Sequence, residues 1–449
     1  MHFPRGPIDF ARCTSQMLAL IACLFSLAIA APAAEVTATR LDGSTTTGEL
    51  RGWEASQIVV AAPNGEQRIA TDQLLSLNWP PPASPFTQST ILPGVVELTD
   101  GSEIPIANLG VQSASATANQ SSRGTASLFS PLASLLKDTP LVSTIPTNVI
   151  SVVRFSPLDG ALAKQWEEIR SLKAPGDLLV VAKRDGASLD YVEGVVGEIT
   201  NDKVEFKLDG ESNRVDRAKV TGVVYSHPND SAASKTLFVL HGRSGLRLTV
   251  TEIHLADEFV TVKTTACASL HWPVADLERA DFSSGKVSYL SDIEPASQNW
   301  TPLVGLPTGV SLAAQYGLPR RNHSAFGDLL TLSVKDKDAD ATQSAKLRTF
   351  TKGLALRSHT ELVYRLPEGF NRFTALAGID PATASTGNVR LKILADDRSL
   401  FDAEIAGDQP PQPIDIPISN AKRLKIVVDF GQNLDTGDWL NLCDAKIVK

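Results

Sequence analysis

The sequence predicts an all-β protein in which several small β-domains precede a larger C-terminal module. A pattern of apolar and aromatic residues recurs in the region before Gly285, and stretches such as Lys203–Leu208 and Glu258–Val262 alternate between polar and apolar residues. An alternation with a period of two is typical of half-buried strands. A chain of 449 residues is also too long for one hydrophobic core. We therefore expect roughly two to five domains.

The recurring pattern occurs four times between Glu35 and Gly285. In each copy an apolar residue is followed by a second five positions later, by a third three positions later, and by an aromatic residue two positions after that. The four copies are Ile69, Leu74, Leu77 and Trp79; Ile145, Ile150, Val153 and Phe155; Val215, Val220, Val223 and Tyr225; and Trp272, Leu277, Ala280 and Phe282. Each copy is expected to end a small repeat of short strands.

A strand pair with a tight turn is predicted ahead of each copy. The turns fall at Asp42-Gly43, Asp100-Gly101 and Asp185-Gly186 in the first three repeats, and Gly242–Gly245 takes that place in the fourth. The dipeptide Asp-Gly supplies the positive φ that such turns need. The ending of each repeat, a strand, a short turn and a strand, resembles small Sm-like barrels in its architecture.

These observations predict four tandem β-barrel-like repeats. Their predicted boundaries are 35–82, 83–156, 176–228 and 229–285. A Ser/Ala/Thr-rich insertion in the second repeat, Gln112–Ser127, is predicted to be a flexible loop. Residues 157–175 are predicted to form a helix that connects the second and third repeats. The apolar face of that helix consists of Leu162, Trp166, Ile169 and Leu172.

The first 34 residues predict a secretory signal peptide. Arg5 and Arg12 precede the apolar run Met17–Ala30, and small residues come directly before Glu35. A basic start, a short apolar stretch and a small-residue end are typical of such signals. The run is too short to cross a bilayer comfortably, and no later segment is long enough. We therefore expect a secreted, periplasmic or cell-surface protein with no transmembrane segment in the mature chain.

The four cysteines do not predict a disulfide framework. Cys13 and Cys23 belong to the signal peptide, which leaves Cys267 and Cys443 in what we interpret as different domains. Each of these two is expected to be a small buried apolar residue. Leu20–Cys23 fits a bacterial lipidation box, but a further apolar stretch follows the cysteine, which argues against lipidation.

Charge and histidine patterns exclude several classes of function. The net charge of −8 is spread without a basic stripe, and phosphate contacts need clustered Lys and Arg, so no nucleic-acid partner is expected. The seven histidines form no zinc-binding grouping. Asp336–Asp340 imitates the start of a calcium loop, but Ala341 and Leu347 replace its required glycine and glutamate. We expect an acidic surface loop there, with weak calcium binding as the alternative, and predict no cofactor and no other metal site.

The C-terminal module, residues 286–449, carries a series of short motifs in a recognisable order. These are Tyr289–Glu294, Lys352–Leu354, Glu361–Leu366, Phe373–Asp380, Asp435–Trp439 and Asp444–Ala445. The series resembles the NPCBM family of carbohydrate-binding modules, which is named for modules attached to family 98 glycoside hydrolases. The resemblance implies a jelly-roll β-sandwich and a glycan ligand. In this family a histidine often follows the Gly-Leu pair; here Arg357 occupies that position and His359 follows two residues later.

Sugar recognition usually needs an aromatic plate and a few polar groups for the hydroxyls. The candidate carbohydrate-binding residues are therefore Trp439, Asp438, Asp435, Asn441, Arg357 and His359. The alternative role for Trp439 is that of a core residue on the last strand. An exposed Trp439 would favour glycan binding, whereas a fully buried one would favour a structural role.

The function that the sequence predicts is that of an exported, non-catalytic carbohydrate-binding protein. The repeats would be a scaffold or a second interaction surface, and the partners would be a glycan or cell-surface polysaccharide and envelope proteins. The alternative is a cell-envelope assembly protein whose sandwich no longer binds sugar. Leu237–Gly242 looks like the oxyanion-loop strand of an α/β-hydrolase, but no Gly-x-Ser-x-Gly elbow accompanies it. No catalytic residues are predicted.

Overall fold

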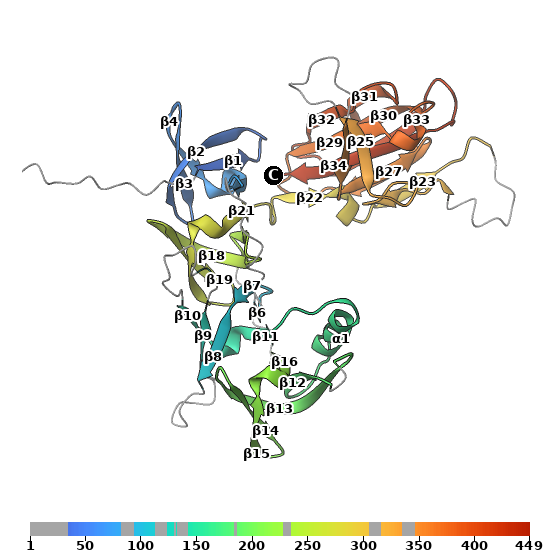
Figure 1. The fold of residues 1–449 in the computed structure, drawn as a ribbon. Coiled ribbons are helices and arrows are strands. Elements are labelled where there is room, and N and C mark those ends of the chain that lie inside the picture. The colour runs from blue at the N-terminus through green and yellow to red at the C-terminus, as the bar shows by residue number, and fades with distance from the viewer. Residues whose placement is uncertain are drawn as a thin grey trace, which may run out of the picture. The chain divides into compact units, whose positions relative to one another are not determined.

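The computed structural model describes residues 35–81, 94–112, 124–129, 132, 142–183, 186–227, 235–304, 316–334 and 346–449. The predicted signal peptide, the centre of the Ser/Ala/Thr-rich insertion and the calcium-like segment lie outside these residues. The described chain is nearly all β, with the single α-helix α1 at Gly160–Arg170 (Figure 1). The prediction of an all-β fold is thus confirmed. Among the described helices, none is long and apolar enough to cross a membrane.

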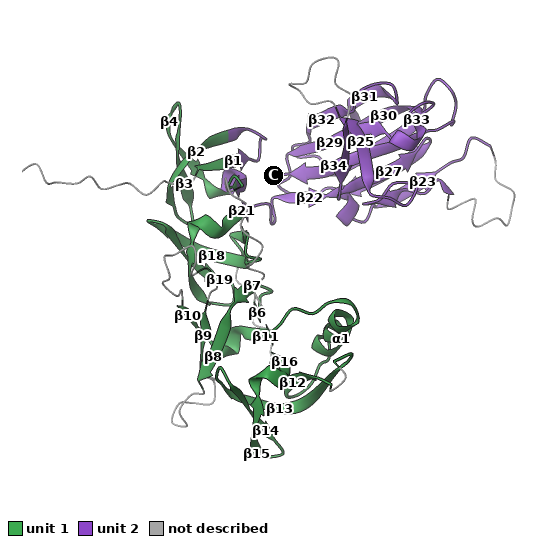
Figure 2. Ribbon diagram, in the orientation of Figure 1, with its two compact units in different colours: residues 1–37, 46–71, 78–279 green, residues 38–45, 72–77, 280–449 purple. Residues whose placement is uncertain are grey.

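Two compact units make up the chain (Figure 2). Unit 1 contains residues 1–37, 46–71 and 78–279, and unit 2 contains residues 38–45, 72–77 and 280–449. The units divide the first repeat between them, so they do not decide where one repeat ends and the next begins. The repeat boundaries given above remain predictions.

Each copy of the recurring sequence pattern forms a strand, a short 3-10 turn (η) and a second strand. These are β4 (Gly65–Ala70), η1 (Thr71–Gln73) and β5 (Leu74–Asn78); β10 (Val142–Pro146), η4 (Thr147–Val149) and β11 (Ile150–Arg154); β15 (Glu211–Asp216), η5 (Arg217–Lys219) and β16 (Val220–Val224); and β20 (Ser269–Pro273), η6 (Val274–Asp276) and β21 (Leu277–Asp281). Of the sixteen pattern residues, Val215 alone is not buried. The pattern therefore marks the core face of these paired strands.

The remaining strands of the repeats precede these endings. They are β1 (Glu35–Arg40), β2 (Thr45–Trp53) and β3 (Gln57–Ala62); β6 (Gly94–Leu98), β7 (Glu103–Ile106), β8 (Asn108–Gln112) and β9 (Thr125–Phe129); β12 (Asp177–Ala182), β13 (Leu189–Ile199) and β14 (Lys203–Leu208); and β17 (Phe238–Gly242), β18 (Arg247–Ala256) and β19 (Phe259–Thr264). The predicted turns have the expected backbone, with positive φ at Gly43, Gly101, Gly186 and Gly245.

In the second and third copies, the spacing of three within the pattern comes from a β-bulge at the start of the last strand. In β11 the register against β6 shifts between Ile150 and Val152, and in β16 the register against β12 shifts between Val220 and Gly222. The extra residue turns an expected spacing of two into three while both flanking apolar side chains face the core. The sequence pattern thus records a bulge as well as a strand.

The described sheets are open, and none of them closes into a barrel. β11 of the second repeat pairs with β6 on one side and with β16 of the third repeat on the other. Strand β11, which would have to close a barrel in the second repeat, therefore connects the second repeat to the third. The predicted barrel-like repeats are therefore not closed barrels, because strand pairing continues from the second repeat into the third.

The predicted connector helix is found, but it is shorter than expected. Helix α1 occupies Gly160–Arg170, and Trp166 and Ile169 pack in a cluster with Val152 of the second repeat and Leu178 of the third. Leu172 lies beyond the helix end and is 44% exposed, so it is not part of the apolar face. The ends of the predicted flexible insertion are also strands, because Gln112 of β8 pairs with Thr125 of β9.

Unit 2 contains a β-sandwich. One sheet has the order β24, β27, β34, β29 and β32, with β22 added on β34, and the other has the order β23, β28, β33, β30 and β31. Its elements are β22 (Val287–Tyr289), η7 (Leu290–Asp292), β23 (Ser297–Trp300), β24 (Arg320–Arg321), β25 (Leu330–Val334), β26 (Lys346–Phe350), β27 (Gly353–Arg357), β28 (Thr360–Arg365), β29 (Arg372–Ile379), η8 (Pro381–Thr383), β30 (Asn388–Ala395), β31 (Arg398–Ala406), β32 (Gln412–Pro417), β33 (Arg423–Phe430) and β34 (Trp439–Val448). A single apolar core contains residues of both sheets, among them Phe373, Leu442 and Ile426.

The two cysteines of the described residues differ in exposure. Cys443 is fully buried on β34, whereas Cys267 is exposed in the turn after β19, with a φ of 66°. The expectation that both are buried is therefore wrong for Cys267, because a residue in a surface hairpin turn has no core to enter. Burial also raises the pKa of the Cys443 thiol.

This difference predicts selective modification of the folded protein. Because the thiolate is the reactive form, iodoacetamide should label Cys267 in the native state and Cys443 after denaturation. Peptide mapping by mass spectrometry measures both sites in the same sample. Equal labelling rates for the two cysteines before denaturation would contradict the structure.

Candidate functional site

An aromatic cluster lies at one end of the sandwich, where the chain enters β34 and leaves β27. Arg357 ends β27 and pairs directly with Trp439, the first residue of β34. The Trp439 ring meets the rings of Tyr316 and Phe326 edge-on, at centroid distances of 5.7 and 6.4 Å. Edge-to-face packing at such distances is favourable for aromatic rings.

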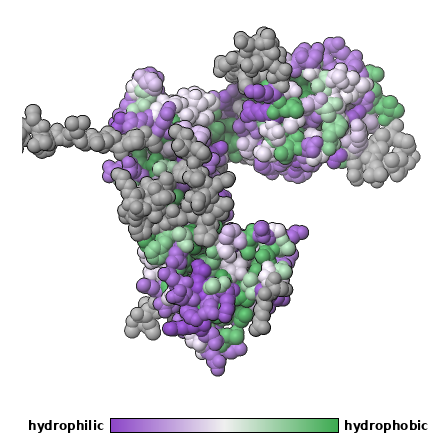
Figure 3. Space-filling view, viewed as in Figure 1, coloured by the Kyte–Doolittle hydropathy of each residue, from purple (hydrophilic) through white to green (hydrophobic). Residues whose placement is uncertain are grey.

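Exposure separates the members of this cluster into a floor and a rim. Trp439 is only 2% exposed, whereas Tyr316 is 54% and Phe326 is 51% exposed. Figure 3 shows hydrophobic residues in green at the end of unit 2 where β23 and β33 are labelled in Figure 1. Trp439 thus forms a buried floor, and we call Tyr316 and Phe326 the aromatic rim.

A guanidinium group connects the floor and the rim. Arg357 lies over both the Tyr316 ring, 4.9 Å from its centroid, and the Trp439 ring, 5.5 Å from its centroid. Its Nη2 donates to the Asp435 carboxylate at 3.2 Å and to the Asp435 carbonyl oxygen at 3.3 Å. Cation–π contacts and a charge pair together hold the arginine side chain in one orientation.

The backbone of Gly317, directly after the rim residue Tyr316, lies close to the ring of Trp300. A Cβ added to Gly317 would lie 1.9 Å from Cε2 of Trp300, so only glycine fits against this indole. The Trp300 Nε1 donates to the Ser358 carbonyl oxygen at 3.2 Å. The segment that begins at Tyr316 is thereby seated next to the turn between β27 and β28.

Asp438 and Asn441 make internal hydrogen bonds. The Oδ1 of Asp438 accepts from the backbone N–H of Asn388 at 3.1 Å, and both residues 438 and 441 are fully buried. The Nδ2 of Asn441 donates to the Thr331 carbonyl oxygen and to Asp380. Burial, more than any neighbouring group, raises the pKa of Asp438. These two side chains join neighbouring loops and strands of the sandwich.

The remaining predicted site residue, His359, is exposed in the turn between β27 and β28, with a φ of 62°. Its ring packs against Phe430, 5.0 Å between centroids, and not against the aromatic rim. The structure therefore brings Trp439, Arg357 and Asp435 together and leaves His359 beside them.

Sequence reasoning missed Tyr316 and Phe326. They precede Trp439 by more than a hundred residues, and neither belongs to a long strand. A signal was present, because each is an aromatic residue directly followed by glycine, Gly317 or Gly327, in a polar stretch. Large aromatic residues in turns are often exposed and available for binding.

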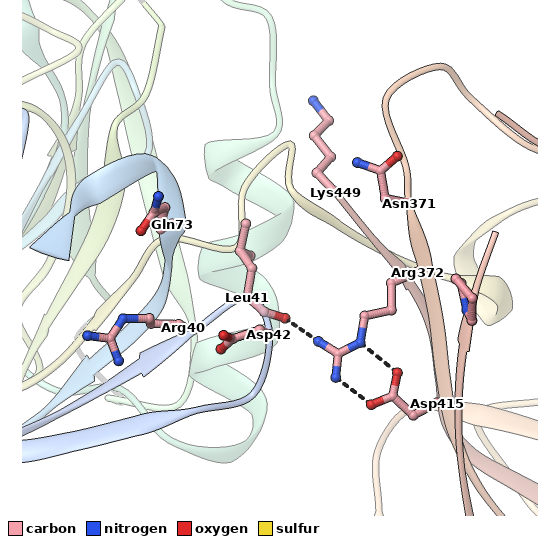
Figure 4. A pocket seen from close by; sticks show the side chains of 9 residues that line it. Arg40, Leu41, Asp42, Gln73, Asn371, Arg372, Asp415 and Lys449 are labelled. Atoms are coloured by element: carbon pink, nitrogen blue, oxygen red, sulfur yellow. Dashed lines mark hydrogen bonds and ion pairs between the residues drawn. The ribbon is translucent and has the colours of Figure 1, made fainter. Parts of the chain in front are cut away.

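A second candidate in unit 2 is a cleft of about 500 Å³ (Figure 4). It is lined by Arg40, Leu41, Asp42, Gln73, Asn371, Arg372, Asp415, Pro417 and Lys449. Arg372 binds both oxygens of Asp415 and donates to the Leu41 carbonyl oxygen at 2.8 Å. The central cation of the cleft is thus already paired, which leaves the aromatic rim as the stronger candidate.

Among the described residues, no group of three or more His, Cys, Asp and Glu side chains is arranged to hold a metal ion.

Residues 286–448 match the NPCBM/NEW2 domain. The resemblance noted in the sequence is thereby confirmed, and the aromatic rim lies within the NPCBM/NEW2 domain. No curated protein matches the chain.

Several solved carbohydrate-binding modules are similar to parts of the chain. CBM51 from Clostridium perfringens GH95, solved with methyl-galactose, is 24% identical over 36% of this chain and 99% of its own, with a TM-score of 0.30. CBM51-2 with the INT domains of Clostridium perfringens ZmpB, solved with GlcNAc, is 20% identical over 45% of this chain and 42% of its own, with a TM-score of 0.30. The tandem CBM51 modules of Sp3GH98, the family 98 glycoside hydrolase from Streptococcus pneumoniae SP3-BS71, are 11% identical over 79% of this chain and 99% of their own, with a TM-score of 0.30.

Proposed function

We propose that this is an exported, non-catalytic protein whose NPCBM/NEW2 domain binds glycan at the aromatic rim. The observation that carries the proposal is the pair of half-exposed rings, Tyr316 and Phe326, packed on the buried Trp439. An exposed aromatic face can cover the apolar face of a sugar ring. The match of residues 286–448 to the NPCBM/NEW2 domain supports the same conclusion.

In this proposal the six predicted site residues have different roles. Trp439 supports the rim from below, and Asp438 and Asn441 fix the surrounding loops from the interior. Arg357 and Asp435 supply polar groups beside the rings, and His359 is available at the edge of the site. Such a shallow site should bind with a Kd between about 1 μM and 1 mM, because it immobilises a flexible, hydrated ligand.

The β-repeats would serve as a scaffold or as a second interaction surface, for envelope proteins among others. The protein would act outside the cell, in the periplasm or at the cell surface. The predicted signal peptide motivates this location.

A glycan-array screen of the full chain tests the proposal. The array includes galactose and N-acetylglucosamine termini, the sugars present in two of the similar module structures. We expect saturable binding that falls at least about tenfold in Tyr316→Ala, because each tenfold loss corresponds to only about 1.4 kcal/mol of contact energy.

Tyr191→Ala is the matched control, because Tyr191 is 44% exposed on β13 in unit 1 and is far from the rim in sequence. It should leave glycan binding unchanged. An equal loss in both variants, or no binding by a well-folded wild type on a broad array, would refute the proposal.

The burial of Trp439 favours a second candidate function, that of an envelope assembly protein. A tryptophan that is 2% exposed cannot present its own face to a sugar. In that case the aromatic rim would contact another protein. Capture of a defined envelope protein that Tyr316→Ala abolishes, together with an empty glycan array, would establish this alternative.

A further inference from the structure

The positive charge beside the aromatic rim, on Arg357, is paired with the negative charge of Asp435. This pairing affects whether a neutral or an acidic glycan can bind. The inference rests on the proposed function and concerns the substrate class of the same site. Arg357 is the cation that touches the rim ring Tyr316, and its side chain is only 13% exposed. Its charge is paired with Asp435, whose side chain is 35% exposed.

An acidic sugar would need a cation with free donors at this place. The Nη2 of Arg357 donates to both the Asp435 carboxylate and the Asp435 carbonyl oxygen. Its flat faces lie against Tyr316 and Trp439. A guanidinium whose charge is already paired with a carboxylate attracts a second carboxylate less strongly.

One further acidic residue lies close to the pair. Asp438 follows Asp435 by three residues, is fully buried, and interacts electrostatically with both Arg357 and Asp435. Arg321, which lies on β24 between the two rim residues in the sequence, is paired with Glu294, and Arg320 beside it also has an interaction partner.

We propose that the Arg357–Asp435 pair restricts the aromatic rim to neutral glycans, and that Asp435 is the residue that determines this selectivity. A neutral ring can pack on Tyr316 and share hydrogen bonds with the pair. A carboxylate on the same ring would meet Asp435 without a compensating cation, and placing like charges together opposes binding.

The test compares neutral oligosaccharides with counterparts that carry one uronic or sialic acid residue, measured on the full chain at low salt. Wild-type protein should bind the acidic counterpart at least about tenfold more weakly. In Asp435→Asn the guanidinium loses its charge partner and becomes available, so this ratio should fall to about threefold or less.

Asp402→Asn provides the matched control, because it removes the same charge from an exposed pair with Arg390 at the β30–β31 hairpin. Its ratio should equal that of wild type. Arg357→Gln provides an independent test. It leaves the Asp435 carboxylate without its charge partner, so the ratio of neutral to acidic glycan affinity should become larger than in wild type. Circular dichroism and thermal unfolding confirm that each variant is folded.

Different failures have different meanings. If wild-type protein binds acidic counterparts as tightly as neutral ones, or if Asp435→Asn leaves the ratio unchanged, the selectivity proposal is wrong while glycan binding stands. If wild-type protein binds no glycan of either kind, the proposed function itself fails and takes the selectivity proposal with it.

Discussion

Replacement of Asp276 by alanine should lower the free energy of unfolding of unit 1 by about 2–5 kcal/mol, since each buried donor left unpaired costs about 1–3 kcal/mol. Asp276 is 1% exposed in η6. Its Oδ2 accepts from the Trp272 Nε1 at 2.8 Å and from the Ser244 hydroxyl at 2.6 Å, and its Oδ1 accepts from the Ser244 N–H at 3.0 Å. A Cβ on Gly242 would lie 2.4 Å from this carboxylate, so the site is closely packed.

The measurement is urea unfolding, with hydrogen exchange to assign the transition to unit 1. Glu258→Ala, an exposed change in the same repeat, is the control and should alter the free energy of unfolding by less than about 0.5 kcal/mol. A similar, small effect of both substitutions would show that Asp276 does not hold η6 to the Ser244 turn.

The free energy of unfolding of wild-type protein and of Asp276→Ala can also be compared as a function of pH. Burial, ahead of every other cause, raises the pKa of Asp276 above its ordinary value of 3.8. A carboxyl with a raised pKa binds its proton more tightly in the folded state than in the unfolded state. Its protonation therefore stabilises the fold at a pH below the ordinary pKa, and this stabilisation is lost as the pH rises through the raised pKa. The destabilisation caused by Asp276→Ala should therefore be larger near about pH 4 than near about pH 8.

Replacement of Phe373 by alanine should destabilise the NPCBM/NEW2 domain by about 3–5 kcal/mol, the range for truncating a buried phenylalanine. Phe373 is fully buried on β29, within the core that both sheets of the sandwich share. Its removal opens a cavity among strands that are held in place on both sides, since β29 pairs with β32 and β34. Such a cavity can collapse only partly.

Thermal and urea unfolding of unit 2 measure this effect. Phe326→Ala is the matched control, because it removes the same atoms from a side chain that is 51% exposed. It should change the stability by less than about 1 kcal/mol while it lowers glycan binding. If the two truncations cost the same stability, Phe373 does not lie in a close-packed core.

The sequence pattern and the structure agree best where the pattern reflects local geometry. The spacing of five, three and two residues that ends in Trp79, Phe155, Tyr225 or Phe282 corresponds to a strand, a 3-10 turn and a second strand in each copy, and that second strand is bulged in the second and third copies. Periodicity reports which side chains share a face, so it locates the core reliably. The family resemblance located the sandwich in the same way, through motifs that lie on its strands.

Features that depend on contacts between distant segments could not be read from the sequence. The burial of Trp439 depends on Tyr316 and Phe326, which come from loops more than a hundred residues earlier. Nothing in the local sequence around Trp439 states what covers its ring. For the same reason the pairing of β11 with a strand of the next repeat could not be predicted, because it is not visible within either repeat.

The double pairing of β11 limits how this architecture can be rearranged. A strand that belongs equally to the second and third repeats cannot be removed with one of them and leave the other intact. Deletion of either repeat would expose a row of unpaired backbone groups, which invites aggregation. Because β7 of the second repeat also pairs with β18 of the fourth, these repeats can be exchanged only as a connected group and not one at a time.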